Sequence, residues 1–226
     1  MAFFLLLLFF SFYLRFSLME LTLEFAYELL KKEEVPDHII RHSEKVALIS
    51  LFLGCLLKEK GEPLDLNLLT CSALLHDIKK MASIKTGENH AFSGYKLMKE
   101  LGFERAGEII YAHIFLKAPN PNSPIREEEI VFYADKRVKH DEIVTLKERF
   151  KDLRERYGRT LKSLIRMRLL EDMTLLLEKR LFKKIELKPE DLLILNEIKE
   201  AKDVLKRCLK GCTTCWRDIF RTRSFS

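Results

Sequence analysis

Apolar residues recur every three or four positions along most of the chain, the spacing of one face of an α-helix. The 226 residues include only 8 glycines and 6 prolines, so few breaks interrupt this pattern. No segment alternates convincingly between apolar and polar residues, as a half-buried β-strand would. Residues 81–89 read as a looser connection. The pattern therefore predicts an all-α protein with helices over residues 20–33, 37–59, 65–80, 90–101, 104–116, 126–142, 143–156, 160–183 and 189–208.

Several of the predicted apolar faces carry a histidine or an aspartate. His42 lies one turn after Ile39 and one turn before Val46, so its side chain shares their inward stripe. Three more polar residues have apolar neighbours one turn away, namely Asp77, His113 and Asp135. Residues of these types are costly to bury without a partner.

A metal ion is the simplest compensation for these buried groups. A buried carboxylate costs several kcal/mol unless a charge compensates it. Among the positions three or four residues from Asp135, only Lys139 is a cation, and it lies at the edge of the stripe. A divalent cation would compensate both aspartates at once, with neutral imidazoles as its other ligands. Any one of these histidines alone is more often a hydrogen-bonded core residue. Their joint order on successive helices favours a metal site formed by His42, His76, Asp77, His90, His113 and Asp135.

This order of residues resembles the HD-domain metal-dependent phosphohydrolase superfamily. The resemblance covers about residues 35–145 and rests on five segments: "RHSEKVA", "ALLHDIKK", "HAFSGYKLM", "IIYAHIF" and "VFYADKRV". It implies an HD-domain helical bundle, followed here by a C-terminal helical extension. Elements that mark several larger subfamilies are missing, so the chain looks like a small stand-alone member of the HD or HDIG type.

The resemblance also implies roles for individual residues. The core metal ligands would be His42, His76, Asp77 and Asp135, and the additional histidines of two-metal members would be His90 and His113. Asp77 would bridge the two ions, which could be manganese, iron, cobalt or magnesium. Lys80 matches a lysine that can approach a substrate phosphate, so Asp77 and Lys80 are the expected catalytic residues. Lys79 stands where the family's motif has glycine, which leaves the shape of the phosphate pocket open.

The expected function is hydrolysis of a phosphate ester of a small phosphorylated compound, with a nucleotide as one candidate, by a metal-activated water. The alternative is a non-catalytic HD-fold signalling or interaction module. Lys136 and Arg137 are either further phosphate contacts or part of a solvated face, and His38 is either a contact near the site or an exposed residue. His140 is expected to be solvated.

Residues 1–18 form a hydrophobic segment that is shorter than a membrane span requires. Three interpretations remain open: an anchor built on residues 2–14, an uncleaved signal-like segment, or an extension that precedes a true start at Met19. The expected divisions are 1–18, an HD metal-dependent phosphohydrolase domain over 19–157, and a helical extension and tail over 158–226. Membrane association is expected only if residues 2–14 are an anchor.

The net charge is +6, with a pI near 9.0, and suits an anionic substrate. Basic and acidic residues are interleaved, so nucleic acid is not indicated as a partner, and no oligomeric state is predicted. Five cysteines resemble no disulfide framework, which favours a reducing, cytoplasmic compartment. Cys208, Cys212 and Cys215 read as incidental thiols, with an iron–sulfur cluster or zinc site as the alternative.

Overall fold

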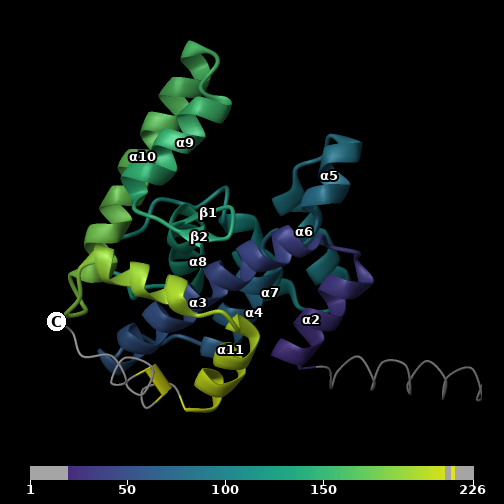
Figure 1. Ribbon diagram of the computed structural model, residues 1–226, viewed down its shortest axis with the longest axis vertical. Helices are drawn as coiled ribbons and strands as arrows, with labels where there is room; N and C mark the ends of the chain where they lie inside the picture. Colours follow the sequence, from purple (N-terminus) through teal and green to yellow (C-terminus); the bar gives the residue numbers. More distant parts are fainter. Residues whose placement is uncertain (1–19, 212–214, 217–226) are drawn as a thin grey trace, which may run out of the picture.

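The computed structural model describes residues 20–211, 215 and 216, and these residues form a mostly helical protein (Figure 1). The all-α prediction is confirmed, apart from one hairpin of two-residue strands. The elements are α2 (Leu23–Lys32), α3 (Asp37–Glu59), α4 (Leu66–Leu75), α5 (Lys80–Thr86), α6 (His90–Glu100), α7 (Glu104–Ala112), α8 (Glu127–Lys136), β1 (Val138–Lys139), β2 (Glu142–Ile143), α9 (Leu146–Tyr157), α10 (Leu161–Phe182), the 3-10 helix η1 (Pro189–Glu197) and α11 (Ala201–Lys210).

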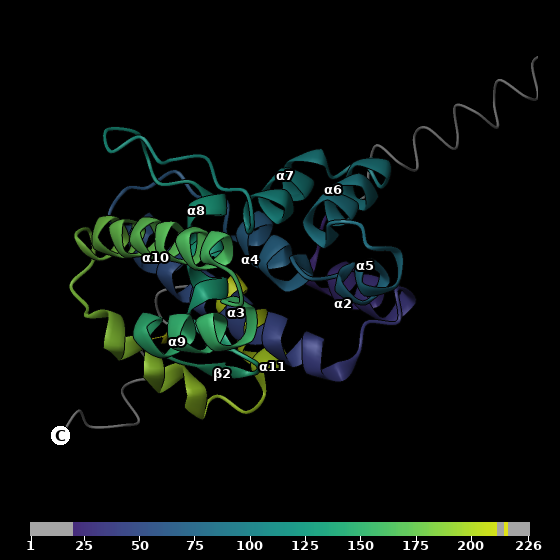
Figure 2. The same ribbon diagram turned by 90° about the horizontal axis from the view of Figure 1, so that it is seen from above.

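Helix α3 is the centre of the fold. It packs against α4 and α8, and α11 covers another side, as the two views show (Figures 1 and 2). Val46, Leu48, Ile49 and Leu51 point in different directions around α3, yet all four are buried. A helix that is apolar on all sides must be surrounded by other elements to be stable. The histidine at position 42 is near the N-terminal end of this helix.

The predicted helix over 65–80 ends early. Asp65 caps α4 by accepting a hydrogen bond from the backbone N–H of Leu68, and the helix stops at Leu75. A tight turn follows, in which the N–H of Lys80 bonds to the carbonyl of Asp77. Helix α5 then replaces the loose connection that we expected after residue 80. Asp77 therefore lies in the turn between α4 and α5, where it is buried.

The predicted helix over 126–142 is also too long. Helix α8 ends at Lys136, and residues 138–143 form the hairpin of β1 and β2, with His140 at a left-handed φ of 55°. Arg137 is buried, and its guanidinium donates to the carbonyl of Val144, whose N–H returns a bond to the carbonyl of Arg137. These two bonds join the ends of the hairpin, so tertiary contacts rather than helix propensity determine the structure of residues 138–143.

One long C-terminal helix over 189–208 was predicted, whereas the structure has η1 and α11 with a break between them. The ammonium of Lys45 donates to the carbonyls of Leu195, Asn196 and Ile198, the groups that a continuing helix would use. The side chain of Asn196 bonds to both the N–H and the carbonyl of Ile143. Tertiary contacts therefore end the helix. The extension packs against α3, α8 and α9, while its division from the rest at residue 157 stays a prediction.

Cys208 and Cys215 form a disulfide, so the expectation of incidental thiols is wrong for these two. Amphipathic α11 packs on α3 and buries Cys208, and the Cα atoms of Cys208 and Cys215 lie 5.2 Å apart. The pairing contradicts a cluster held by all three thiols, although Cys212 lies outside the described residues. Cys55 is also disulfide-bonded, and Cys71 is a free, buried thiol. A reducing compartment was inferred because the cysteines were expected to be unpaired, and these disulfides contradict that premise.

We expect the double variant Cys208→Ala/Cys215→Ala to lose about 2 kcal/mol of unfolding free energy, because the bond closes a short loop and restricts the unfolded chain. Urea unfolding without reductant measures the loss. The metal content of the protein should not change, since α11 contributes no group to the site described below. An unaltered unfolding midpoint would show that the bond adds nothing to stability.

The hydrophobic segment over 1–18 lies outside the described residues. Within the part of the chain that the structure describes, no helix is long and apolar enough to cross a membrane.

Candidate metal centre

Five segments bring the six predicted ligands to one place. His42 lies in the second turn of α3, His76 and Asp77 follow α4, and His90 is the first residue of α6. His113 directly follows α7, and Asp135 lies near the end of α8. Asn89 caps α6 through bonds to the N–H groups of Ala91 and Phe92. This cap fixes the start of the helix and thereby the position of His90.

Three of the histidines are oriented by backbone carbonyls. The Nδ1 atoms lie 2.6 Å from the carbonyl of His140 for His42, 2.8 Å from that of Ala73 for His76, and 2.5 Å from that of Ile110 for His113. A carbonyl only accepts hydrogen bonds, so Nδ1 carries the hydrogen in each ring. The Nε2 lone pair is then free to bind a cation when the ring is neutral, which is how metal-binding histidines are usually held.

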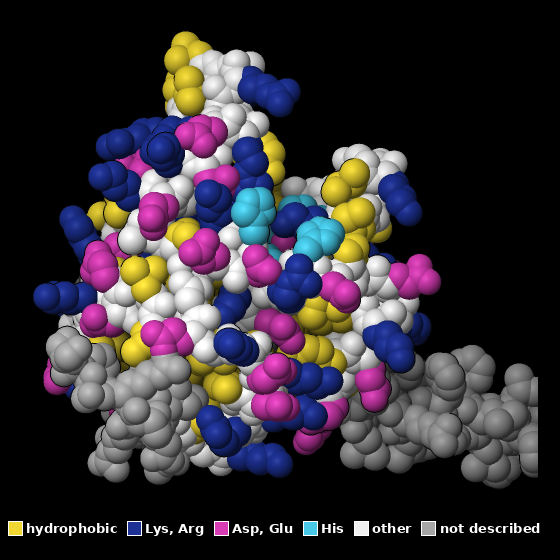
Figure 3. All heavy atoms as spheres, viewed as in Figure 1, with side chains coloured by type: hydrophobic (Ala, Val, Ile, Leu, Met, Phe, Trp, Pro, Cys, Tyr) yellow, Lys and Arg dark blue, Asp and Glu magenta, His cyan; other side chains and the backbone are white. Residues whose placement is uncertain are grey.

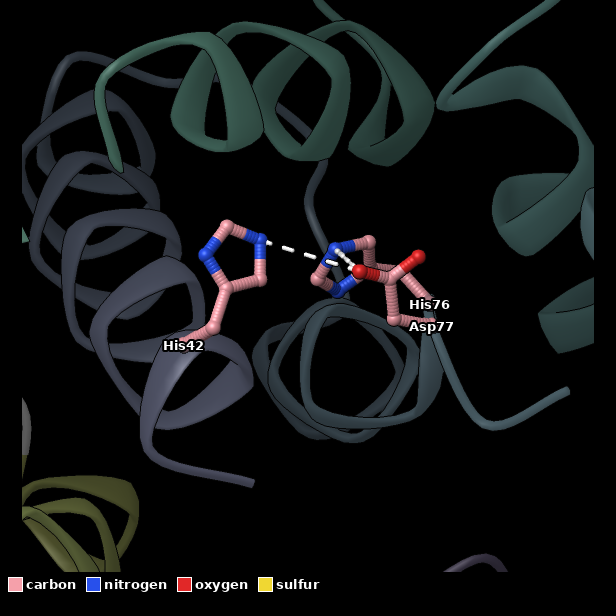
Figure 4. A group of neighbouring side chains, drawn as sticks. All are labelled: His42, His76 and Asp77. Carbon is pink, nitrogen blue, oxygen red and sulfur yellow. Dashed lines mark ion pairs between the residues drawn. The ribbon is translucent and has the colours of Figure 1, made fainter. Parts of the chain in front are cut away.

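The first group of possible ligands is His42, His76 and Asp77, shown in Figure 4. Oδ2 of Asp77 lies 3.8 Å from Nε2 of His42 and 3.5 Å from Nε2 of His76. Oδ1 of Asp135 is 3.2 Å and 3.6 Å from the same two nitrogens, so it adjoins this group. Nε2 of His76 is buried and has no hydrogen-bond partner among the described residues. A buried nitrogen without a partner is costly, and a cation here would satisfy it.

The second group is Asp77, His90 and His113. Oδ1 of Asp77 lies 3.1 Å from Nε2 of His90 and 3.8 Å from Nε2 of His113. The two histidine nitrogens are themselves 3.2 Å apart. The two oxygens of Asp77 therefore face different groups, which is the arrangement that a bridging carboxylate requires.

The charges in the site favour ionised carboxylates. Burial raises the pKa of Asp77, but His76, His90 and Lys80 outweigh burial and hold this pKa well below its ordinary value. Asp135 behaves in the same way, because the positive groups beside it also overcome burial. Two neighbouring carboxylates that stay ionised make the site strongly negative, and a bound cation would be stabilised there.

The histidines respond to burial and charge in opposite ways. Burial, reinforced by the charge of His76, lowers the pKa of His113 to about 3, so this ring is neutral. Burial also lowers the pKa of His76, but Asp77 and Asp135 more than reverse this and raise it overall. Without a metal, the two aspartates therefore favour the protonated form of His76. The set of imidazole nitrogens and carboxylate oxygens fits a divalent transition metal, which would supply the same positive charge.

Comparison with known proteins agrees with this geometry. A family model described as "HD domain" matches residues 39–139, which include all six predicted ligands. The chain contains an HD domain. The resemblance inferred from the sequence is therefore confirmed.

Two curated relatives align with a large part of the chain. An uncharacterised protein of Methanocaldococcus jannaschii is 29% identical over 149 residues, which are 60% of this chain and 87% of that protein. A tRNA (cytidine(56)-2'-O)-methyltransferase of Picrophilus torridus is 31% identical over 135 residues, or 53% of this chain, but only 37% of the methyltransferase is covered. No solved structure matches the chain.

A cleft of about 470 Å³ opens above the first group of the HD domain and includes His42 and Asp77 in its lining. Figure 3 shows histidine side chains at the surface between the projecting helices α9 and α10 and helix α5, with lysine and arginine beside them. Lys80 lines the cleft, and its Nζ lies 2.5 Å from Oδ2 of Asp77. The predicted catalytic pair is thus in direct contact. His38 lines the cleft as well.

Helix α9 supplies a wall of the cleft that was not predicted from the sequence. Arg149 and Arg156 line the cleft from this helix, which follows the matched residues of the HD domain. Asp152 pairs with both arginines. The i, i+7 spacing of the two arginines places them on one helix face, and this was a usable signal. The sequence did not reveal that this face turns toward the metal groups.

Lys136 and Arg137 are neither solvated nor among the residues that line the cleft. The ammonium of Lys136 donates to the carbonyl of His113 and to Oδ2 of Asp135, at 2.6 Å and 2.8 Å. It therefore ties two candidate ligands together. The side chain of His140 is exposed, as predicted, but its carbonyl orients His42.

Proposed function

We propose that this protein is a metal-dependent phosphohydrolase that cleaves a phosphate ester of a small phosphorylated compound. The observation that carries the proposal is the pair of His/Asp groups that share Asp77, because Asp77 and His42 line a cleft together with cationic side chains. HD domains are typically phosphohydrolases. A non-catalytic HD module would not need all six ligand positions, and here all six are filled and adjoin one another.

Asp77, His42 and His76 would hold one divalent cation together with Asp135, and Asp77 would share a second with His90 and His113. Bound cations lower the pKa of a coordinated water and neutralise charge on a phosphoryl group. The chain's own residues do the rest. The backbone carbonyls hold the imidazoles in place, so little reorganisation is needed when substrate binds.

The cleft supports an anionic substrate. Lys80, Arg149 and Arg156 line it from two sides, α5 and α9. Nε of Arg149 is buried and has no hydrogen-bond partner among the described residues, so this arginine has a donor available. A guanidinium can bind phosphate oxygens in pairs, which fixes their orientation. We infer that Lys80 and the α9 arginines contact the phosphate groups of the substrate.

The direct test combines metal analysis of the purified protein with a panel of phosphomonoesters and phosphodiesters. The proposal expects bound divalent metal and hydrolysis of at least one class, with loss of hydrolysis on chelation and recovery on adding manganese, iron, cobalt or magnesium. A metal-free protein that stays inactive after each of these ions is added would favour the interaction module.

We expect Arg149→Gln to raise KM about tenfold, because a charge-assisted hydrogen bond of about 1.5 kcal/mol is lost. The change in kcat should be smaller, since the metal groups stay intact. Arg154→Gln is the matched control, because Arg154 lies on the same helix but pairs with Glu171 and does not line the cleft. An equal KM for the wild type and Arg149→Gln would remove this arginine from the substrate site.

A further inference from the structure

Helix α10 has two apolar faces, and the described residues cover one of them. The inner face packs on the fold, with Thr174, Leu177 and Leu181 buried and with Leu170 and Met173 against the core. A helix with apolar residues on both sides is normally covered on both. The second apolar face of α10 is exposed to solvent in a single copy of the chain, which is unusual for an apolar surface.

The outer face carries six exposed apolar side chains. Four are more than half exposed, with Leu161 at 75%, Leu176 at 67%, Leu169 at 64% and Ile165 at 52%. The other two are Leu164 and Leu175. These positions recur at spacings of three, four and seven residues, so they form one continuous stripe. A stripe of this length exceeds the scattered apolar residues of an ordinary surface and marks an interaction site.

The helix is accessible along this stripe. Helices α9 and α10 form a hairpin that projects beyond the rest of the described residues (Figure 1). Arg154 of α9 pairs with Glu171 of α10, which braces the hairpin on its inner side. A helix of 22 residues is about 33 Å long, so the outer face can meet a partner helix over several turns.

Four of the six outer apolar residues and one charge pair are arranged symmetrically about position 170, whose own side chain lies on the inner face. Leu164 and Leu176 lie six residues before and after it, and Ile165 and Leu175 lie five residues away. Two residues away on either side are Arg168 and Asp172, which carry opposite charges. These two form an exposed ion pair of 3.2 Å in the middle of the apolar stripe.

We propose that α10 pairs with α10 of a second copy of this chain, antiparallel and about a two-fold axis that passes the outer face at the level of residue 170. In such a pair, every residue lies at the height of the position at the same distance on the other side of the axis. Leu164 is then level with Leu176, Ile165 with Leu175, and each Arg168 with Asp172 of the other copy, while Leu161 and Leu169 have no apolar counterpart. A parallel pair would place Arg168 against Arg168, so the charges select the antiparallel orientation.

The charge pair provides a sharp test of this dimer. Sedimentation or light scattering over a hundredfold range of concentration should show the full chain at twice its mass of 26.7 kDa. Arg168→Asp and Asp172→Arg should each weaken the dimer at least tenfold, since each brings like charges together across the axis. The double variant Arg168→Asp/Asp172→Arg should restore it. Arg166→Asp is the matched control, because Arg166 lies on the same helix outside the stripe.

A monomer throughout the concentration range would overturn the proposal. So would single variants that dimerise as well as the wild type, or a double variant that remains as weak as the singles. Circular dichroism of each variant separates loss of the dimer from loss of the helix.

Cross-linking tests the orientation independently. Leu169→Cys lies one residue from the axis, so two copies should form an interchain disulfide. Lys162→Cys lies eight residues from the axis, which separates the two copies of this residue by about 24 Å and prevents the bond. Cross-linking at residue 162 without cross-linking at residue 169 would overturn the antiparallel pairing. Neither test depends on the proposed hydrolase activity.

Discussion

Asp77→Ala should sharply weaken metal binding at both groups and reduce hydrolysis by about a thousandfold or more. Oδ2 faces His42 and His76, while Oδ1 faces His90 and His113, so one substitution removes a ligand from each group. The second group then keeps only neutral imidazoles, and the first keeps Asp135 as its one carboxylate, so the charge of a divalent cation is poorly balanced at both. Both consequences follow from the position of Asp77 between the two groups.

The measurement is metal content per chain by elemental analysis, together with turnover on the best substrate of the panel. Asp203→Ala is the control, because Asp203 is an exposed carboxylate on α11, remote from the predicted ligands in the sequence. Its metal content and turnover should equal those of the wild type. An Asp77→Ala protein that keeps the wild-type amount of metal would contradict the shared-carboxylate interpretation and leave Asp77 with a structural role.

His90→Ala and His113→Ala should each reduce bound metal from about two ions per chain toward one. Each also should lower turnover about a hundredfold, because a clamp of two ions on the attacking and leaving oxygens becomes a single Lewis acid. The fold should persist, since His42, His76, Asp77 and Asp135 keep the first group. Circular dichroism and metal titration with manganese, iron, cobalt and magnesium check these expectations.

His38→Ala is the control for the metal count, because His38 lines the cleft but belongs to neither group. It should keep two ions whatever its effect on substrate binding. If His90→Ala and His113→Ala keep the wild-type metal content and change mainly KM, these histidines contact substrate and the second group is not a metal site. A wild-type protein that never binds more than one ion leads to the same conclusion.

The periodicity of apolar residues was enough to predict the segments that carry the site and the side chains that face inward. Helical periodicity records the burial of each position, so His42, Asp77, His113 and Asp135 stood out among apolar neighbours before any contact was known. The structure brings these four together with His76 and His90. The helical fold was predictable for the same reason, whereas the HD domain was predicted from the resemblance of five motif segments to a known family.

The surroundings of the metal groups depend on contacts between segments that are far apart in the chain. The carbonyl of His140 reaches His42 across 98 positions of the sequence, after a hairpin that local propensity does not favour. Arg149 and Arg156 read as surface residues of a charged helix until α9 is seen over the cleft. The bond between Cys208 and Cys215 was not predicted from their spacing in the sequence. Local patterns fix which face of an element turns inward, but the partner across the fold is chosen by packing between segments far apart in the chain.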